Sequence, residues 1–429
     1  MVVVRESEAA AIRTAIEMIG KALQHYQAGR LDEAEWLSRQ VLVADPRQVN
    51  GLHLLGLVLQ ERGRLDEAIA CICKGLDLKP DYHVEAYHNL GELLKKQGRL
   101  DEAIACIRKG LDLKPDDPHA HLGLAAALLA RGDMAEGWEE YEWRWKTPAM
   151  IKNVRNFSQP LWRGEVAEGR TLLIHAEQGL GDTIQFCRYA SRAAARGLRV
   201  IMEVQRPLVR LFHGLPWVDL VLGHGEELPD FDLHCPMLSL PLALRTTITT
   251  IPSGTCYLHA DEAQATAWRA RLVSMANQGP RIGLVWAGNP DAAAVDRLRS
   301  LAPDRLAPLF DLPGLHFFSL QKGGPAAPEN FPLTNFMDEM GDLADTAALI
   351  ANLDLVISVD TAVAHLGGAL GKPVWLLDRF DPCWRWLTGR RDSPWYPSLR
   401  LYRQPSRGDW DTVLAEVTGD LCSFALKAG

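Results

Sequence analysis

A four-residue motif that returns at a nearly constant spacing constrains the first third of this 429-residue chain. The sequence Leu-Asp-Glu-Ala begins at Leu31, Leu65 and Leu100, with offsets of 34 and 35 residues. Glycine and proline recur at similar spacing, at Gly29, Gly63, Gly98, Gly132, Pro46, Pro80 and Pro115. Such a period is typical of stacked supersecondary units, each of which buries its apolar face only against its neighbours. The sequence therefore predicts a helical repeat array.

Small residues stand where the two helices of each unit would touch. Gly56 and Ala68 in the second unit correspond to Gly91 and Ala103 in the third, with larger apolar residues between them. This pattern resembles the tetratricopeptide repeat (TPR). The resemblance implies an α-helical TPR solenoid of about four units over residues 1–148.

The outer units depart from the pattern, as end caps of a repeat array usually do. The first unit, about 15–48, is degenerate. The fourth, about 118–146, is aromatic, with Trp138, Tyr141, Trp143 and Trp145. We expect these aromatic residues to form a docking face against the next domain, and a peptide-binding patch is the alternative. The array itself either recruits a polypeptide or serves as a docking or dimerisation module, so a homodimer stays open.

Composition and charge exclude several functional classes. The net charge of −8 argues against nucleic acid as a partner. No apolar run reaches the roughly 18 residues of a membrane span, and the first residues do not form a signal peptide, so we expect a cytoplasmic protein. The eight cysteines include no C-x-x-C pair, which favours reduced thiols over a disulfide framework.

After Pro148 strand-like runs alternate with helical ones. The runs at Thr171–Ala176 and Leu198–Val204 begin a first series, and a second series starts at Arg281. This alternation is typical of βαβ units in parallel sheets. We predict an α/β fold with two Rossmann-like halves, residues 149–277 and 278–429. The two halves would face a cleft, since ligands bind beyond the carboxyl ends of such strands.

The first half contains the motif Gly179-Leu180-Gly181-Asp182 directly after an apolar strand. Glycines let the backbone approach a ligand closely, and the free N–H groups of a helix start favour anions such as phosphate. We therefore expect Gly179 and Gly181 at the bound donor. A carboxylate at this point can take a proton from an incoming nucleophile, which makes Asp182 the catalytic candidate.

The second half contains a matching element in which a buried strand runs into Asp360-Thr361 and then a helix. Asp and Thr are both good N-cap residues. The Thr361 hydroxyl and the first free N–H groups could also hold a phosphate. His365 follows Thr361 by four residues on the same helical face, so we expect it to contact the same ligand.

These two motifs together resemble the heptosyltransferase-like glycosyltransferases of family 9, which have the GT-B fold. The region of about 157–405 is similar to the C-terminal half of bacterial TPR proteins that carry such a domain. The resemblance implies a nucleotide-sugar donor on the C-terminal half, an acceptor on the N-terminal half and Asp182 as catalytic base. The nucleoside-diphosphate sugar would be the substrate, with no cofactor and no metal ion.

The remaining donor-site candidates are Trp286, Gly288, Asn289, Arg297, Arg299, Gln321 and Lys322. Most of them lie just after predicted strands of the second half. The two arginines offer planar donors that suit the oxygens of a diphosphate.

The chain departs from the family pattern at two points. Ala362 stands where the family has glycine after Asp-Thr, and residues 291–297 lack the His and Asn-Asp that relatives carry there. We expect transfer of a sugar to a hydroxyl on a protein or glycan, with the acceptor held by the TPR array. The alternatives are a degenerate domain in a TPR scaffold and a nucleotide-sugar epimerase of the same fold.

Overall fold

Contacts in the computed structural model divide the chain into two compact units. The structure describes residues 2–81, 84–254, 256–275, 279–289, 293–381 and 383–428. The first unit holds Met1–Lys152 with Cys383–Arg385, and the second holds Asn153–Pro382 with Trp386–Gly429. The helical third of the chain and the α/β part therefore pack largely within themselves.

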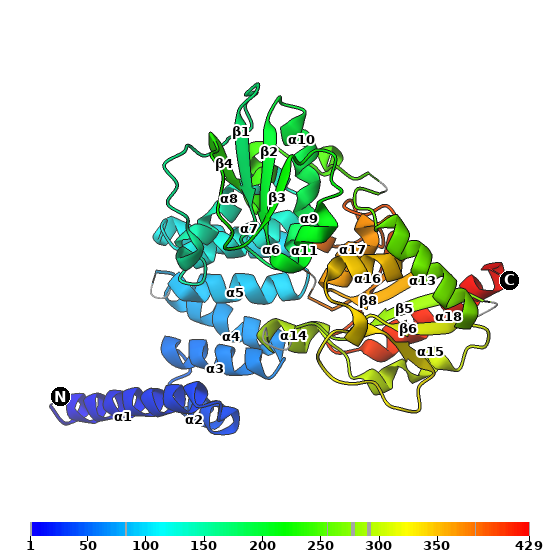
Figure 1. The fold of residues 1–429 in the computed structure, drawn as a ribbon. Coiled ribbons are helices and arrows are strands. Elements are labelled where there is room, and N and C mark those ends of the chain that lie inside the picture. Colours follow the sequence, from blue (N-terminus) through cyan, green and yellow to red (C-terminus); the bar gives the residue numbers. More distant parts are fainter. Residues whose placement is uncertain are drawn as a thin grey trace. The chain divides into compact units, whose positions relative to one another are not determined.

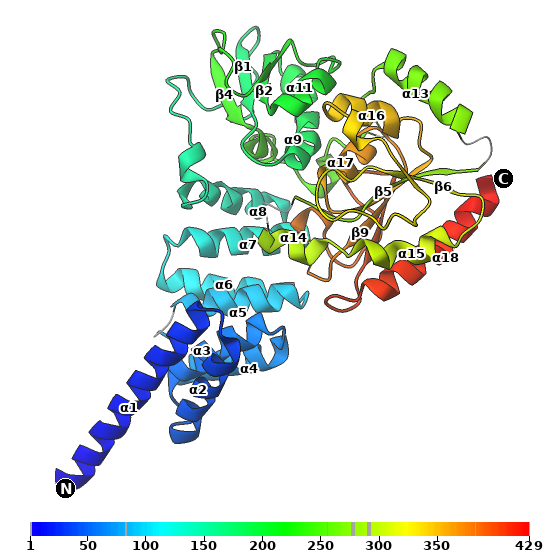
Figure 2. The same ribbon diagram turned by 60° about the horizontal axis from the view of Figure 1, so that its bottom comes forward.

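The first unit consists of helix pairs stacked side by side (Figures 1 and 2). Its helices are α1 (Val2–Gln27), α2 (Leu31–Ala44), α3 (Val49–Glu61), α4 (Leu65–Leu78), α5 (Val84–Lys96), α6 (Leu100–Leu113), α7 (Pro118–Arg131) and α8 (Met134–Tyr141). Two short 3-10 helices, η1 (Glu142–Lys146) and η2 (Ile151–Asn153), follow. The predicted solenoid of helix pairs is confirmed.

The small residues of the repeat have a steric reason. A Cβ on Gly56 would lie 2.6 Å from Cγ1 of Ile72, and one on Gly91 would lie 2.3 Å from Cγ1 of Ile107. Both distances are too short for real carbon contacts, so the paired helices approach too closely for any side chain at these positions. Between the helices of a pair, Gly98 has a φ of +74°, a conformation that glycine adopts without strain.

A later segment of the chain covers part of the aromatic cluster in the last repeat. Trp138 is almost completely buried, and the ring of Trp384 packs edge-on against it at 5.3 Å. Trp384 also lies 5.8 Å from Tyr141, which places Cys383–Arg385 in the helical unit. This part of the expected docking face is therefore covered by the ring of Trp384, from elsewhere in the chain.

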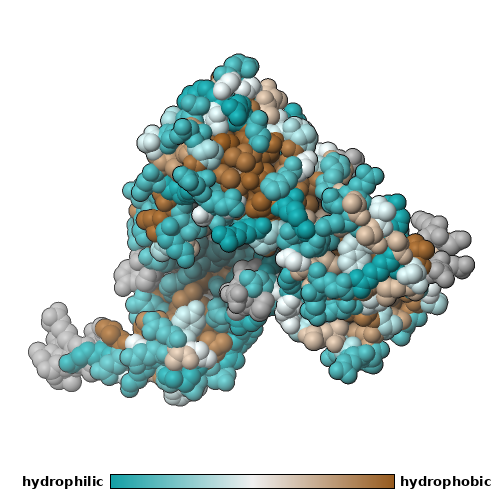
Figure 3. Space-filling model, in the orientation of Figure 1, coloured by the Kyte–Doolittle hydropathy of each residue, from teal (hydrophilic) through white to brown (hydrophobic). Residues whose placement is uncertain are grey.

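The second unit contains two all-parallel sheets. The four-stranded sheet has the order β3-β2-β1-β4. Its strands are β1 (Thr171–His175), β2 (Arg199–Val204), β3 (Leu220–Gly223) and β4 (Leu233–Pro236). Its helices are α9 (Leu180–Phe186), the 3-10 helix η3 (Cys187–Tyr189), α10 (Ala190–Ala194), α11 (Arg206–Phe212) and α12 (Leu240–Ala243). Apolar side chains gather where Figure 1 draws this sheet, as Figure 3 shows.

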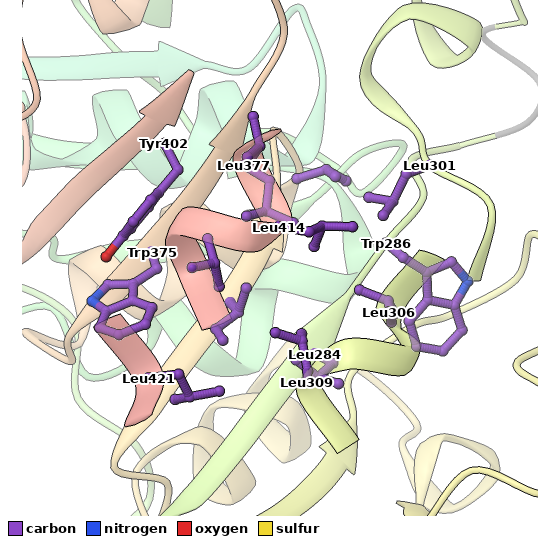
Figure 4. Packing of buried hydrophobic residues seen from close by; sticks show 14 of the residues in the cluster. Leu284, Trp286, Leu301, Leu306, Leu309, Trp375, Leu377, Tyr402, Leu414 and Leu421 are labelled. Carbon is purple, nitrogen blue, oxygen red and sulfur yellow. The ribbon is translucent and has the colours of Figure 1, made fainter. Parts of the chain in front are cut away.

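The six-stranded sheet has the order β10-β9-β8-β5-β6-β7. Its strands are β5 (Arg281–Val285), β6 (His316–Ser319), β7 (Leu333–Asn335), β8 (Leu355–Val359), β9 (Val374–Asp378) and β10 (Leu399–Arg403). The helices of this part are α13 (Glu262–Met275), α14 (Ala293–Arg299), α15 (Ala307–Phe310), α16 (Leu343–Ile350), α17 (Ala362–Ala369) and α18 (Trp410–Ala428). Figure 4 shows Leu414 and Leu421 of α18 in one buried cluster with Leu284 and Trp375.

The order of the strands in each sheet indicates where a ligand could bind. β1 lies between β2 and β4, and β5 lies between β6 and β8, so each sheet reverses its strand order beside its first strand. Ligands of open parallel sheets bind beyond the carboxyl ends of the strands at such switch points. A TPR solenoid followed by two such sheets confirms the predicted α/β GT-B fold class. The helical stretch between β1 and β2 is divided into α9, η3 and α10.

Two glycines inside helices give a direct test of repeat packing. Gly91→Ala should destabilise the helical unit by about 1–3 kcal/mol, because the new methyl group overpacks against Ile107. Gly20→Ala in α1 is the matched control, since a Cβ there meets nothing within 4 Å. It should stabilise the protein by up to about 1 kcal/mol through helix propensity. Urea unfolding followed by circular dichroism measures both, and shifts of equal sign would contradict this packing.

Candidate functional site

Asp182 closes the first turn of α9. Gly179 is the N-cap residue of this helix, and its N–H group donates to Oδ2 of Asp182 at 3.0 Å. A carboxylate here also faces the positive end of the helix, which is worth about 0.3–1 kcal/mol. The half-buried Asp182 therefore has a structural role at the position expected for the catalytic base.

The loop before Gly179 is anchored across the switch point of the four-stranded sheet. The carboxylate of Glu177 accepts the backbone N–H groups of Met237, at 3.1 Å, and Leu238, at 3.2 Å. These contacts join the end of β1 to the segment after β4. The carbonyl of Gln178 accepts from Nε2 of Gln205 at 2.7 Å. The backbone that presents Asp182 is thus held from two sides.

The starts of α9 and α17 pack directly against each other. A Cβ on Gly181 would lie 2.9 Å from Cδ2 of His365 and 3.5 Å from Cα of Ala362. Only glycine leaves room for the second helix at this point. The two motifs singled out in the sequence therefore meet, but they touch here instead of facing each other across a gap.

The start of α17 has backbone donors that its N-cap side chain does not cover. Thr361 is the N-cap residue in extended conformation, and its side chain makes no capping bond. Its hydroxyl lies 3.0 Å from Oγ of Ser358. The first N–H groups of a helix have no acceptor within the helix, so this start is suited to an anion.

Arg299 joins the ends of β5 and β8 at the switch point of the six-stranded sheet. Its Nη1 donates to the carbonyl of Asp360 at 2.9 Å. The guanidinium also lies over Gly288, where a Cβ would be 2.2 Å from Nε. Arg299 therefore places a cation beside the start of α17. Arg297 is exposed, and Asn289 lies exposed at the end of the same segment.

The side chain of Gln321 holds the chain after β5. Its Oε1 accepts the backbone N–H groups of Trp286, at 3.1 Å, and Ala287, at 2.9 Å. Its Nε2 donates to the carbonyl of Ala287 at 3.1 Å. The amide predicted to contact the donor thus bonds to backbone in this structure. Nζ of Lys322 likewise donates to the carbonyl of Met340 at 3.0 Å.

A hollow of about 390 Å³ lies beyond the ends of β5, β6 and β7. Its lining combines apolar, glycine-rich and acidic groups, and three of the predicted donor residues, Trp286, Gln321 and Lys322, belong to it. The acidic and amide residues of the lining are Glu329, Asp338, Gln321 and Asn335. The hollow occupies the side of the switch point where β6 and β7 extend the sheet.

His365 is buried and held on two sides. Only 4% of its surface is exposed, and its ring stacks on Trp386 with centroids 5.1 Å apart. Nδ1 lies 2.9 Å from the hydroxyl of Tyr396, and Nε2 lies 3.9 Å from Oδ1 of Asp360. The imidazole therefore sits between a tyrosine and the acid at the end of β8.

A second acid, absent from the sequence-based candidates, lies nearby at the end of β9. Asp378 is 1% exposed, and its Oδ2 accepts from Nε of Arg403 at 2.7 Å. Its Oδ1 is buried without a hydrogen-bond partner among the described residues. Burial raises the pKa of Asp378 to about 6, with a further contribution from Asp360, while Arg403 opposes the shift.

The structure brings most of the predicted residues to the carboxyl edges of the two sheets. Those that lie at the switch points are Gly179, Gly181, Asp182, Trp286, Gly288, Arg299, Gln321, Asp360, Thr361 and His365. Of the altered residues 291–297, the first two fall outside the described residues, and the others belong to α14. Arg188, Tyr396 and Asp378 were not predicted from the sequence, although all three lie in the region of about 157–405 that resembles the family.

The described residues contain no group of three or more His, Cys, Asp or Glu side chains placed to hold a metal ion. In the same residues, none of the helices has the length and apolar character needed to cross a membrane.

Comparisons with known proteins bear on both units. Residues 329–377 match the model of glycosyltransferase family 9 (heptosyltransferase), and residues 47–116 and 118–137 match tetratricopeptide repeat models. Protein FlbA from Caulobacter vibrioides is 29% identical, over 95% of this chain and 76% of FlbA. The chain therefore combines tetratricopeptide repeats with a segment like family 9.

Two solved structures are also similar to part of the chain. The MamA protein is 24% identical over 31% of this chain and 72% of its own, with a TM-score of 0.29. YrrB, described as a TPR protein with an unusual peptide-binding site, is 18% identical over 32% of this chain and 71% of its own, with a TM-score of 0.30.

The family 9 match covers one of the two motifs. It includes Asp360, Thr361 and His365, together with the hollow's lining from Glu329 onward. The motif around Asp182 lies outside it. The match therefore supports a glycosyltransferase-like second half, and the role of the first half rests on geometry.

The raised pKa of Asp378 leads to a prediction of how the stability of the protein depends on pH. Its folded-state pKa of about 6 exceeds the ordinary 3.8, so the folded protein holds this proton more tightly than the unfolded chain. The bound proton adds roughly 3 kcal/mol to the free energy of unfolding below about pH 4. This contribution decreases as the pH rises from about 4 to about 6 and is absent at higher pH. Urea unfolding between pH 4 and 7 should show this slope.

Asp378→Asn should flatten that slope, because the amide takes up no proton. Asp411→Asn, at a carboxylate on the surface, is the control and should leave the slope unchanged. An unaltered slope in Asp378→Asn would show that another group titrates in this window.

Proposed function

We propose that the α/β unit transfers a sugar from a nucleoside-diphosphate donor to a hydroxyl group of a polypeptide or glycan. The observation that carries the proposal is the packing of the α17 start on Gly181, next to Asp182. This packing joins α9, which follows the first strand of one sheet and holds Asp182, to the start of α17 beside the other sheet, where the N-cap side chain makes no capping bond. The family 9 match over 329–377 supports the same reaction class.

The donor would bind along the carboxyl edge of the six-stranded sheet. Its diphosphate would take the uncapped N–H groups at the start of α17, with the guanidinium of Arg299 beside them. The nucleoside would fill the hollow after β5, β6 and β7. Its lining includes the carboxylates of Glu329 and Asp338, which can accept hydrogen bonds from ribose hydroxyls. Acidic residues bind ribose in this way in nucleotide-binding parallel sheets.

The chemistry is a displacement at the anomeric carbon. Asp182 takes the proton of the acceptor hydroxyl, whose oxygen forms the new bond to that carbon. The bond from the carbon to the donor's diphosphate oxygen breaks, and the diphosphate leaves with its extra negative charge. Fixed donors aimed at that charge, at the start of α17 and on Arg299, stabilise it.

The helical unit would supply the acceptor. Repeat solenoids present extended surfaces that hold polypeptides, and residues 47–137 match TPR models almost throughout. A polypeptide acceptor, or a glycan carried on one, is the partner that this architecture favours.

A scaffold with an inactive transferase domain is the second candidate. The engaged side chains of Gln321 and His365 favour it, because both bond to protein groups instead of an open site. The direct contact between α9 and α17 favours it too. This candidate predicts that the chain binds no nucleotide sugar and transfers none.

Removal of the proposed base should separate chemistry from folding. Asp182→Asn keeps an oxygen that can accept the Gly179 N–H bond, so α9 should stay capped. Transfer should fall by roughly 10²–10⁴ while nucleotide affinity stays nearly constant. Asp117→Asn, at the N-cap of α7, is the matched control and should leave transfer unchanged. Full activity in Asp182→Asn would remove the base from the mechanism.

Substitution of the two arginines proposed near the donor should have different effects on nucleotide affinity. Arg299→Gln should weaken binding of UDP, ADP or GDP by roughly 10–100-fold, since a charged hydrogen bond is worth about 1.5–3 kcal/mol. Arg297→Gln should have a smaller effect, because its side chain is exposed. Calorimetry with the three nucleotides measures this, and no binding to the unaltered protein would support the scaffold instead.

A further inference from the structure

A fully buried arginine organises the joint between α9 and the segment after β9. Arg188 lies in η3, directly after α9, and is 1% exposed. Nε donates to the carbonyl of Gln185 at 2.7 Å, and Nη1 donates to the carbonyl of Trp395 at 2.6 Å. Nη2 donates to the hydroxyl of Tyr257 at 2.8 Å. A buried charge is tolerated only when it is hydrogen-bonded in this way.

Two tyrosine rings flank that guanidinium. Its central carbon lies 4.4 Å from the ring centroid of Tyr257 and 4.7 Å from that of Tyr396. Both hydroxyls are buried, and burial raises the pKa of Tyr396 to about 12, against the opposing effect of Arg188. Each tyrosine therefore keeps its hydroxyl proton at neutral pH and has one hydrogen to donate.

The destination of each hydrogen follows from the distances. The hydroxyl of Tyr257 donates to the carbonyl of Ile184 at 2.9 Å, which uses its only hydrogen. The hydroxyl of Tyr396 has two polar contacts: one of 3.5 Å with Tyr257, in which the Tyr257 hydroxyl is placed as the donor, and one of 2.9 Å with Nδ1 of His365. The second has a normal hydrogen-bond length, and Nδ1 is the acceptor that it offers to the Tyr396 hydrogen. Nδ1 of His365 is then an acceptor, and an acceptor nitrogen carries no proton.

We propose that Tyr396 is a positioning residue that fixes His365 in the tautomer with its hydrogen on Nε2. Stacking on Trp386 holds the plane of the imidazole, and the absence of a side chain at Gly181 leaves space along its Cδ2 edge. Nε2 then presents an N–H donor toward Asp360, 3.9 Å away, at the start of α17. In the opposite tautomer that edge would present a lone pair.

The consequence for transfer rests on the proposed function. An N–H donor beside the uncapped start of α17 suits an anionic diphosphate oxygen, whereas a lone pair would repel it. Loss of the Tyr396 hydroxyl frees Nδ1 to take the proton. We expect Tyr396→Phe to lower kcat by roughly 10-fold and to change the donor KM much less, since the N–H group matters most as the leaving charge develops.

Neutron diffraction from crystals of the unaltered, deuterated protein tests the tautomer without any variant and without substrate. Deuterium is expected on Nε2 of His365, and the hydroxyl deuterium of Tyr396 should point at Nδ1. Deuterium on Nδ1, alone or together with Nε2, would overturn the proposal. Because no turnover is involved, this result stands or falls separately from sugar transfer.

The kinetic arm uses Tyr396→Phe with Tyr402→Phe as the matched control. Tyr402 is also buried, and its hydroxyl donates to Oδ2 of Asp420 at 2.9 Å, away from His365. The proposed role of Tyr396 in positioning His365 is supported if only Tyr396→Phe loses kcat and the two variants have the same thermal stability. Equal kcat in both variants would overturn the link to catalysis.

Discussion

The site depends on one steric constraint, the absence of a side chain at Gly181. Without a Cβ there, α17 reaches the start of α9, and Ala362 and His365 lie against the backbone of the other half. Asp182 is the next residue after Gly181, so this contact brings the backbone at the proposed base close to the start of α17, whose N-cap side chain makes no capping bond. Glycine is thus required by packing, and the chemistry proposed for the site follows from that packing.

Two charged side chains, Arg188 and Asp378, are buried in the same α/β unit, which costs free energy that apolar side chains would not cost. Taking an ion out of water costs several kcal/mol even after relaxation. Arg188 is accommodated because carbonyl and hydroxyl oxygens accept from its guanidinium. Asp378 is only partly accommodated, since one of its oxygens has no hydrogen-bond partner among the described residues. Buried charges that break the usual rules of packing tend to concentrate at functional sites.

The sequence could predict what local contacts determine. The Leu-Asp-Glu-Ala period and Gly56 indicate how helices pair within a repeat, and the apolar runs near residues 171, 198 and 281 predicted β1, β2 and β5. Partners far apart in the chain carry no such signal, as for Arg188 and Trp395, which are 207 residues apart. Gln321 shows a different limit, because an amide after a strand suits a ligand and a backbone N–H equally well. Only the fold decides between them.

A crystal structure of the protein with a nucleoside diphosphate, such as UDP, ADP or GDP, tests the central claim most directly. The account predicts diphosphate oxygens within hydrogen-bond distance of the first N–H groups of α17 and of Arg299, with the base in the hollow beside Trp286. A nucleotide bound elsewhere on the chain, or none at saturating concentration, would contradict a sugar-transfer site at this joint.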